Sequence, residues 1–314
     1  MKFAFVVDPL HTLKINKDST YAMLVEADAR GHELYVLRQQ DLAWKRNTVM
    51  GVARQITLRK HPQDWYSLDP AAEIPLTQFE GVVMRKDPPF DMEYITSTWL
   101  LELAADQGAR VFNEPRAIRD HNEKLAIARF TDFITPTLVS RLAVQIDAFI
   151  DEHRDVILKP LGGMGGMSIF RVREGDPNRN VIVETLTDMG ARTIMAQRYI
   201  PEIAQGDKRV LLIAGKPAPY CLARIPKEGE SRGNLAAGGT GVCQPLSPRD
   251  RQIAEALGPE LARRGLLLVG LDIIGDYLTE INVTSPTCFR EITEQSGFNV
   301  AGMFMDALEA GCRR

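Results

Sequence analysis

The segment 270–283 constrains the fold most, because its pattern is typical of an antiparallel hairpin that carries acidic side chains between apolar ones. Apolar and β-branched residues flank a turn pair, Gly275-Asp276. If the turn has three residues, 275–277, then Asp272 lies directly opposite Glu280, with the side chains roughly 5 Å apart. A two-residue turn would place the two side chains on opposite faces. The register therefore decides whether the carboxylates meet.

The facing carboxylates indicate a bound cation. Two carboxylates in an apolar hairpin repel each other and are costly to bury unless a cation lies between them. Asn282 lies on the same face as Glu280, because side chains along a strand alternate with a period of two. Asp272, Glu280 and Asn282 together offer an all-oxygen set suited to Mg²⁺, which usually leaves positions for water and substrate phosphates. A solvent-facing strand edge with two unrelated acids is the alternative, and the apolar flanks 266–271 and 281–283 favour the metal.

Length and composition exclude several classes of protein. With 314 residues, the chain is long enough for two or three domains. A formal net charge of −3 argues against a non-specific nucleic-acid binder, which needs a basic excess. The 4 cysteines have no paired spacing, so neither a zinc site nor a disulfide framework is indicated. The apolar run 1–7 stops at Asp8-Pro9 and is too short for a signal peptide or a membrane span. We expect a cytoplasmic protein that binds neither nucleic acid nor membrane.

The N-terminal part predicts an α/β domain with a parallel sheet, because strand and helix patterns alternate as in βαβ units. The predicted order is strand 3–7, helix 19–30, strand 34–37, strand 81–84, helix 92–105 and strand 110–112. Gly31 can take the left-handed conformation that ends the first helix. Residues 44–69 are polar with scattered aromatics and give no clear period. We assign residues 1–122 to this domain.

The remainder of the chain predicts an α+β fold in two parts, 123–201 and 202–314. The first part combines helices at 123–130 and 144–153 with strands at 137–139, 156–159, 168–172 and 193–200. The second part has strands at 209–213 and 220–225, a helix at 249–264, the hairpin, and a final helix at 300–308.

A lysine at a strand end and a glycine-rich loop indicate a phosphate-binding site. Lys159 ends the strand 156–159, and the loop that follows contains Gly163, Gly165 and Gly166. Glycines let backbone N–H groups turn toward an anion and let a phosphate approach closely. The loop is not a Walker A motif, and a strand instead of a helix follows it, which argues against a Rossmann fingerprint. A flexible hairpin turn is the alternative, but the lysine and the downstream metal set favour nucleotide phosphates.

Two further segments are weaker candidates for nucleotide contacts. Lys124 opens a helix, and a solvated surface charge is its simplest interpretation. Gln197, Tyr199 and Ile200 lie where a strand ends before Pro201, which frees backbone groups. Such an exposed edge could hydrogen-bond an adenine, although spacing alone does not establish it.

A long glycine-rich connection, 226–245, adjoins two arginines. Connections of this length are usually lids, binding loops or disordered segments. The connection leaves directly from Arg224 and Ile225, and Arg209 is predicted on the neighbouring strand. Two arginines beside a lid suit the capture of carboxylate or phosphoryl oxygens and charge stabilisation in a phosphoryl transfer. A disordered linker and surface salt bridges are the alternatives. We predict a mobile lid at 226–245.

With a lysine strand, a glycine-rich hairpin, an arginine pair and an Asp/Glu/Asn set in this order, the chain resembles the ATP-grasp superfamily. Within it, the chain is similar over essentially its whole length to the bacterial glutathione synthetase family. The segments that carry the similarity are 84–91 (MRKDPPFD), 159–166, 221–226 (CLARIP), 232–239 (RGNLAAGG) and 270–288. The first and fourth segments are far more specific than the glycine loop. One departure is Gly162, because an acidic residue is expected at this position in about half of the family.

The resemblance implies a fold, a reaction and an assembly. The fold is an N-terminal parallel-sheet domain followed by a two-part ATP-grasp fold, with a lid subdomain at 123–201 and a C-terminal subdomain at 202–314. The reaction is the ATP-dependent ligation of γ-glutamylcysteine to glycine through an acyl phosphate, which gives glutathione, ADP and phosphate. The assembly is a homo-oligomer, often a tetramer in the family.

The resemblance also assigns roles to individual residues. Arg209 and Arg224 stabilise the transferring group. Mg²⁺, or Mn²⁺ in its place, is held by Asp272, Glu280 and Asn282. The residues assigned to ATP are Lys124, Lys159, Gly163, Gly165, Gly166, Gln197, Tyr199, Ile200 and Asp207. The alternatives are another ATP-grasp carboxylate–amine ligase and a nucleotide-binding ATP-grasp module that does not catalyse a reaction.

Overall fold

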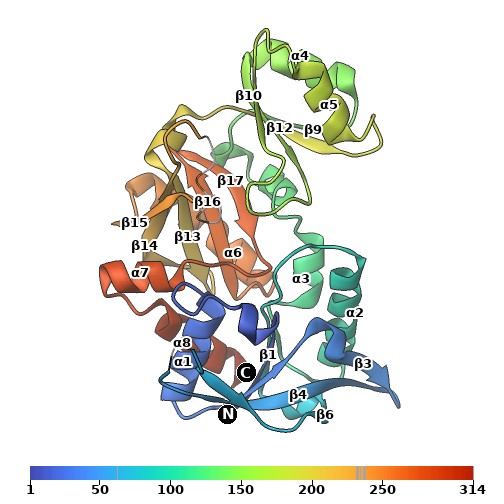
Figure 1. Ribbon diagram of the computed structural model, residues 1–314, viewed down its shortest axis with the longest axis vertical. Coiled ribbons are helices and arrows are strands. Elements are labelled where there is room, and N and C mark those ends of the chain that lie inside the picture. Colours follow the sequence, from blue (N-terminus) through green and yellow to red (C-terminus); the bar gives the residue numbers. More distant parts are fainter. Residues whose placement is uncertain (62, 231–232, 234, 236–237, 314) are drawn as a thin grey trace.

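A computed structural model describes residues 1–313 apart from positions 62, 231, 232, 234, 236 and 237 (Figure 1). Part of the segment 232–239, on which the family resemblance partly rests, therefore lies outside the described residues. The described chain forms an N-terminal sheet, a small sheet in an upper lobe and a third sheet between them (Figure 1). None of the helices in the described ranges has the length and apolar character to cross a membrane.

The N-terminal sheet has a parallel part, as predicted. Its strands are β1 (Lys2–Val6), β2 (Glu33–Leu37), β7 (Gly81–Met84) and β8 (Val111–Phe112), in the spatial order β2-β1-β7-β8. Helix α1 (Ser19–Ala29) begins at Asp18, whose side chain accepts a hydrogen bond from Tyr21 N at 2.8 Å. It covers one face of the sheet, while α2 (Met92–Asp106) covers the other. Helix α3 (Pro115–Asp120) leads out of the domain.

The same sheet has an antiparallel part that the sequence pattern did not reveal. It consists of β3 (Leu42–Lys45), β4 (Thr48–Leu58), β5 (Tyr66–Leu68) and β6 (Ala72–Pro75). Strand β4 alternates buried and exposed positions, but its inward side chains include Gly51 and Ala53, so the apolar period is weak. A Cβ at Gly51 would lie 2.7 Å from Leu37 Cδ1, so a larger side chain there would require the Leu37 side chain to move.

The upper lobe is an antiparallel sheet with two helices on one face (Figure 1). Its strand order is β11-β10-β12-β9. The strands are β9 (Thr137–Ser140), β10 (Asp155–Pro160), β11 (Phe170–Arg173) and β12 (Ile194–Arg198), and the helices are α4 (Ala143–His153) and α5 (Arg179–Thr187). The sequence predicted α4 but not α5.

The third sheet is antiparallel in the order β15-β14-β13-β16-β17. Its strands are β13 (Asp207–Ile213), β14 (Lys216–Ile225), β15 (Thr240–Pro245), β16 (Leu268–Ile274) and β17 (Tyr277–Asn282). Helix α6 (Pro248–Arg263) packs on one face, and α7 (Phe289–Ser296) and α8 (Val300–Cys312) pack on the other, where they also meet α1. The proposed division of the chain at residues 122 and 201 stays a prediction.

Two predicted segments need correction. Residues 240–245, which we assigned to the long connection 226–245, form β15 and pair with β14. The glycines of this stretch hid its strand character. The predicted connection therefore shortens to 226–239, of which positions 231, 232, 234, 236 and 237 lie outside the described residues. The helix predicted at 123–130 is a short 3₁₀ helix, η4 (Leu125–Arg129), because Asn122 Oδ1 accepts the N–H groups of Lys124 and Leu125 and tightens the turn. The other 3₁₀ segments are η1 (Leu10–Thr12), η2 (Gln39–Asp41), η3 (Leu76–Gln78), η5 (Thr131–Phe133) and η6 (Pro201–Gln205).

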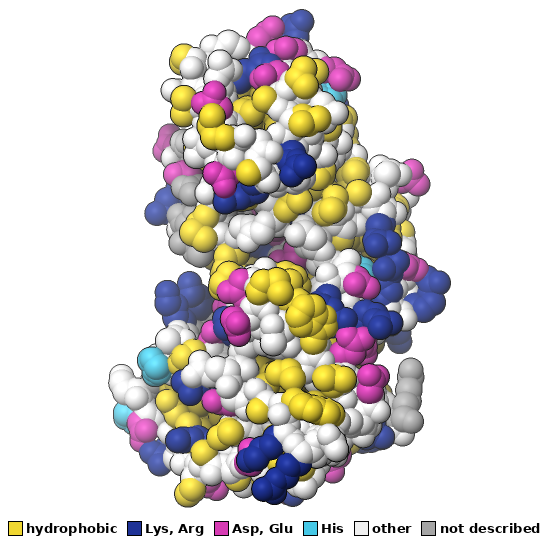
Figure 2. Space-filling view, turned by 90° about the vertical axis from the view of Figure 1, so that its right-hand side faces the viewer, with side chains coloured by type: hydrophobic (Ala, Val, Ile, Leu, Met, Phe, Trp, Pro, Cys, Tyr) yellow, Lys and Arg dark blue, Asp and Glu magenta, His cyan; other side chains and the backbone are white. Residues whose placement is uncertain are grey.

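The face shown in Figure 2 has mixed charge. Lys and Arg side chains are interspersed there with Asp and Glu side chains, and apolar side chains lie in small groups between them (Figure 2). The molecule narrows between the upper lobe and the body (Figure 2).

Candidate active site

The β16–β17 hairpin brings Asp272 opposite Glu280 by a route that the sequence did not predict. The turn has two residues, since Ile274 pairs with Tyr277, yet Asp272 still pairs with Glu280. Thr279 is an extra residue in β17, a β-bulge that restores the register. Its Oγ1 donates to the carbonyl of Asp272 at 3.1 Å. Our inference that a two-residue turn separates the two carboxylates was therefore wrong, because it neglected bulges.

Asp272 is neutralised by two arginines from neighbouring strands. Arg209 lies opposite it on β13 and donates from Nε to Oδ1 at 2.6 Å and from Nη2 to Oδ2 at 3.1 Å. Arg224 on β14 places Nη2 3.0 Å from Asp272 Oδ2 and 2.5 Å from Asp207 Oδ2. We call these four buried residues the arginine network. It supplies the cation that we expected between facing carboxylates, so burial alone does not require a metal at Asp272.

The two carboxylates of the arginine network differ in proton affinity. Burial favours the neutral form of Asp272, but Arg209 and Arg224 hold its pKa below the usual carboxylate range. Burial raises the pKa of Asp207, and the negative charge of Asp272 raises it further against the opposing effect of Arg224. Asp207 Oδ1 is buried and has no hydrogen-bond partner among the described residues. Asp272 is therefore the firmly ionised member of the pair.

Glu280 contacts two lysines. Its Oε1 lies 3.6 Å from Lys124 Nζ and 3.7 Å from Lys159 Nζ. Both lysines are buried, and burial lowers the pKa of Lys159. We call these three residues the lysine cluster. It has two cations for one carboxylate, and this surplus of positive charge favours an anionic ligand such as a phosphate.

The glycine-rich loop lies against the lysine cluster. Lys124 Nζ donates to the carbonyl of Gly163 at 2.5 Å. Gly165 and Gly166 have φ angles of +64° and +78°, in the left-handed region that favours glycine. These positions explain why the loop is rich in glycine, and they bring its backbone to the mouth of a cavity.

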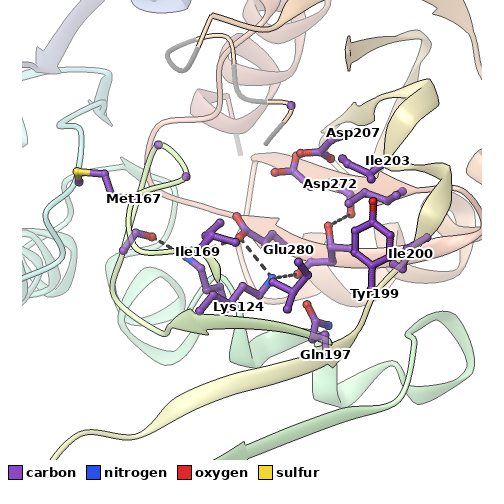
Figure 3. A pocket seen from close by; sticks show the side chains of 18 of the residues that line it. Lys124, Met167, Ile169, Gln197, Tyr199, Ile200, Ile203, Asp207, Asp272 and Glu280 are labelled. Atoms are coloured by element: carbon purple, nitrogen blue, oxygen red, sulfur yellow. Dashed lines mark hydrogen bonds and ion pairs between the residues drawn. The ribbon is translucent and has the colours of Figure 1, made fainter. Parts of the chain in front are cut away.

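A first cavity, of about 110 Å³, opens between the upper lobe and the third sheet (Figure 3). Among its lining residues are the predicted nucleotide contacts Lys124, Lys159, Gly163, Gly165, Gly166, Gln197, Tyr199, Ile200 and Asp207. Figure 3 shows Lys124 and Glu280 pointing toward each other, with Gln197, Tyr199 and Ile200 to one side. The structure thus brings together every residue that we assigned to ATP.

One part of the nucleotide prediction needs correction. Strand β12 is not an exposed edge, because it lies between β10 and β9. The N–H of Tyr199 donates to the carbonyl of Asp155 at 2.9 Å and so is not free. Gln197 is buried, and its Nε2 donates to Thr137 Oγ1 at 3.1 Å. These residues reach the cavity as part of its wall.

A second cavity, of about 230 Å³, adjoins the first. Arg209, Arg224 and Asn282 line it but not the first cavity, whereas Asp272 and Glu280 line both. The two carboxylates therefore stand at the boundary between a space that faces the lysines and a space that faces the arginines.

The second cavity also contains polar residues that we did not predict, among them Asp87, Glu123 and Ser285. Asp87 accepts a short hydrogen bond from Ser285 Oγ. Burial raises the pKa of Glu123 and outweighs the hydrogen bonds from residues 283 and 284 that oppose this shift. Two sequence features could have pointed to these residues. Glu123 directly precedes Lys124, and Asp87 lies in the motif 84–91.

The three predicted metal ligands are oxygen donors of the kind that a hard divalent cation takes, and both oxygens of Asp272 also accept from arginines. Asn282 Nδ2 donates to the carbonyl of Gly270 at 3.1 Å, which leaves its Oδ1 as a possible ligand. The Glu280 side chain is 21% exposed and reaches both cavities. In the described ranges no three His, Cys, Asp or Glu side chains gather around one position. A metal bound here would therefore depend on two carboxylates and an amide, an oxygen set that Mg²⁺ accepts.

Two family models match most of the chain. The N-terminal domain of prokaryotic glutathione synthetase matches residues 1–119, and the ATP-grasp domain of prokaryotic glutathione synthetase matches residues 123–297. The chain belongs to the prokaryotic glutathione synthetase family. Among its relatives in that family, the glutathione synthetase of Nitrosomonas europaea is 62% identical. The alignment covers 100% of this chain and 99% of that relative. That of Pseudomonas aeruginosa is 54% identical and covers 99% of this chain and 98% of its own.

Solved structures share the ATP-grasp fold. D-cycloserine synthetase DcsG superposes with a TM-score of 0.70 at 15% identity, over 99% of this chain and 100% of its own. The ATP-grasp ligase PsnB, complexed with minimal precursor, Mg and ADP, gives a TM-score of 0.64 at 17% identity, over 100% of this chain and 98% of its own. These likenesses confirm the predicted fold class.

Proposed function

We propose that the protein ligates γ-glutamylcysteine to glycine at the expense of ATP, giving glutathione, ADP and phosphate. The protein is an ATP-dependent ligase of the glutathione synthetase family, and the family match extends over both parts of the chain. The observation that carries the chemistry is the boundary position of Asp272 and Glu280 between the two cavities. ATP occupies the first cavity and the peptide occupies the second.

The lysine cluster and the glycine loop hold the phosphates of ATP. Lys124 and Lys159 supply the surplus positive charge, and Gly163, Gly165 and Gly166 let the loop backbone approach closely. The remaining residues assigned to the nucleotide are Gln197, Tyr199, Ile200 and Asp207. This assignment is supported by the position of these four residues in the wall of the same cavity.

Asp272, Glu280 and Asn282 would hold Mg²⁺, or Mn²⁺ in its place. The ion would neutralise charge on the β- and γ-phosphates. The support in the chain is the oxygen donor set and the firmly ionised state of Asp272. Chelation of divalent cations should therefore abolish ADP release, and added Mg²⁺ should restore it.

Arg209 and Arg224 stabilise the group that is transferred. A carboxylate oxygen of the cysteinyl residue attacks the γ-phosphorus, and ADP leaves. The free amine of glycine then attacks the carbonyl carbon of the acyl phosphate, and phosphate leaves with the proton that the nitrogen loses. Both arginines line the peptide cavity, and no hydrogen bond from their Nη1 atoms is made within the described part of the chain. Those donors are available to phosphoryl oxygens. The connection 226–239 closes as a lid and keeps water from the acyl phosphate.

We also propose a cytoplasmic homo-oligomer, with a tetramer as the expected state. The support is the resemblance of the sequence to a typically oligomeric family. Sedimentation equilibrium of the purified protein tests this part independently of the reaction, since a monomer would contradict it.

The reaction is tested with γ-glutamylcysteine labelled with ¹⁸O in its cysteinyl carboxylate. Phosphate should be released only when ATP, Mg²⁺, γ-glutamylcysteine and glycine are all present. Labelled oxygen should appear in inorganic phosphate in step with glutathione. Formation of AMP, or unlabelled phosphate, would contradict the acyl-phosphate route. A panel of other carboxylates and amines separates this function from that of another ATP-grasp ligase.

A further inference from the structure

Glu123 is a carboxylate of the second cavity whose two oxygens differ. Its Oε1 accepts hydrogen bonds from Val283 N at 2.9 Å, Thr284 N at 3.1 Å and Thr284 Oγ1 at 2.8 Å. Its Oε2 makes no hydrogen bond in the described part of the chain, although Glu123 lines the cavity. One oxygen therefore anchors the side chain, and the other is available to a ligand.

The charge of Glu123 has no partner among the described residues, where no Lys, Arg or His lies within ion-pair distance of it. The other carboxylates at the boundary of the cavities do have cations. Asp272 is bonded to the two arginines of the arginine network, and Glu280 contacts the two lysines of the lysine cluster. A half-buried carboxylate without a counter-ion favours a cationic ligand, because desolvated negative charge is costly when it is unpaired.

Glu123 also lies beside the centre of phosphoryl transfer. It directly precedes Lys124, which contacts Glu280. Its backbone carbonyl accepts a hydrogen bond at 2.8 Å from Ile281 N, between the proposed metal ligands Glu280 and Asn282. A cation bound at Oε2 would therefore lie in the cavity that we assign to the peptide, at a residue whose backbone is bonded between the proposed metal ligands.

We propose that Glu123 binds the ammonium group of the amine substrate and positions its nitrogen beside the acyl phosphate, where the nitrogen attacks once the ammonium has passed a proton to the Glu123 carboxylate. This inference rests on the proposed function and names the residue that recognises the amine substrate there. Asp87 is bonded to Ser285 in the same cavity. Among the described residues it makes no backbone hydrogen bond to the strand that carries Glu280 and Asn282, whereas Glu123 does.

The variant Glu123→Gln tests the proposal with little change of shape. Glutamine keeps a carbonyl oxygen for the three donors on residues 283 and 284, and it replaces the free oxygen with an NH₂ group that cannot bind an ammonium. Loss of a charged hydrogen-bond partner predicts a rise of about tenfold to a hundredfold in the KM for glycine. The KM values for ATP and γ-glutamylcysteine should stay unchanged.

A second nucleophile separates recognition of charge from a structural role. Hydroxylamine is uncharged at neutral pH and should trap the acyl phosphate equally well in the wild type and in Glu123→Gln. The expected result is a loss of kcat/KM that is confined to glycine. An equal loss with both nucleophiles, no loss with either, or a change confined to γ-glutamylcysteine would overturn the assignment.

A measurement on the wild type covers the case in which Glu123→Gln does not fold. Glycolate, which has a hydroxyl in place of the ammonium, should compete with glycine at least about tenfold more weakly than glycine itself binds. Equal competition would overturn the proposal. If the wild type forms no ADP with γ-glutamylcysteine and either nucleophile, the proposed function fails. If the wild type is active and Glu123→Gln does not discriminate, only the present inference fails.

Discussion

The arginine network contains Asp272 and the lysine cluster contains Glu280, the two carboxylates that pair across the hairpin, yet the two groups are neutralised to different degrees. In the arginine network two guanidinium groups face Asp207 and Asp272, with contacts between 2.5 Å and 3.1 Å. In the lysine cluster two ammonium groups share one oxygen of Glu280, at 3.6 Å and 3.7 Å. With both of its carboxylates ionised the arginine network is balanced in charge, whereas the lysine cluster has a surplus cation.

This difference separates stability from ligand binding. A balanced and buried network stabilises the fold only while it is complete, because removal of one member leaves a desolvated charge without a partner. A cluster with surplus positive charge binds an anion readily but contributes little to the stability of the free protein. We therefore expect arginine variants to unfold more easily and lysine variants to bind ATP more weakly.

The largest effect is expected for Glu280→Gln, which removes the charge that the proposed metal and both lysines share. Turnover should be abolished, because the phosphates lose their neutralising ion. Removing one of two facing carboxylates would relieve their repulsion, but the contacts of Glu280 with two lysines reverse the expected effect on stability. Lys124 and Lys159 lose their counter-charge, so the ligand-free protein should lose about 1–2 kcal/mol of stability.

Steady-state ADP release and urea unfolding measure the two effects of Glu280→Gln. The control is Glu184→Gln on α5, an exposed side chain outside both cavities, which should behave as the wild type. Activity of Glu280→Gln equal to that of the control would remove the metal assignment.

Arg224→Ala is expected to lower both stability and turnover. It leaves Asp207 and Asp272 with a single arginine, which should cost about 3–5 kcal/mol of unfolding free energy, as for breaking a buried ion pair. Formation of ADP in a single turnover should slow by at least about 10²-fold, as for losing a donor to a developing charge. Urea unfolding and rapid-quench measurements test this. A variant that is slow but fully stable would refute the balance that we ascribe to the network.

Lys159→Met is expected to weaken ATP binding while changing the stability of the free protein little. Loss of one charged donor to the phosphates should weaken ATP binding by at least about tenfold. The stability of the free protein should change by less than about 1 kcal/mol, because a desolvated surplus cation is removed. Calorimetric titration with ATP and thermal unfolding measure the two quantities, with the exposed Lys216→Met as the control. Destabilisation as large as that of Arg224→Ala would erase the distinction between the two groups.

The smallest effect is expected at the root of the connection 226–239. Gln295 Oε1 accepts from Cys243 N at 2.7 Å, and Gln295 Nε2 donates to the carbonyl of Gly241 at 3.1 Å, so the side chain pairs with the edge of β15. Gln295→Ala should loosen this edge by about 1 kcal/mol. Proteolysis after Lys227 should become faster without ligands, and ATP with γ-glutamylcysteine should protect it. Equal cleavage with and without ligands would mean that the connection is a linker.

Much of the fold could be predicted because it is encoded locally. The βαβ order of the N-terminal domain, the lysine strand and the hairpin follow from side-chain periodicity and turn residues within single segments. Strands β3–β6 escaped prediction, because the inward side chains of β4 include glycine and alanine and carry little apolar signal. Helix α5 was missed, and the end of the long connection was placed six residues late.

For the candidate site, the sequence by itself determined which chemical groups are present and in what order: the lysines, the glycine loop, the arginines and the acidic hairpin. Only the tertiary structure decided how they pair. The bulge at Thr279 sets Asp272 against Glu280, strands β13 and β14 bring the arginines to Asp272, and Glu123 reaches the backbone of residues 283 and 284. The physical reason is that cross-strand register and counter-ion choice depend on contacts between segments far apart in the chain, which spacing within one segment does not encode.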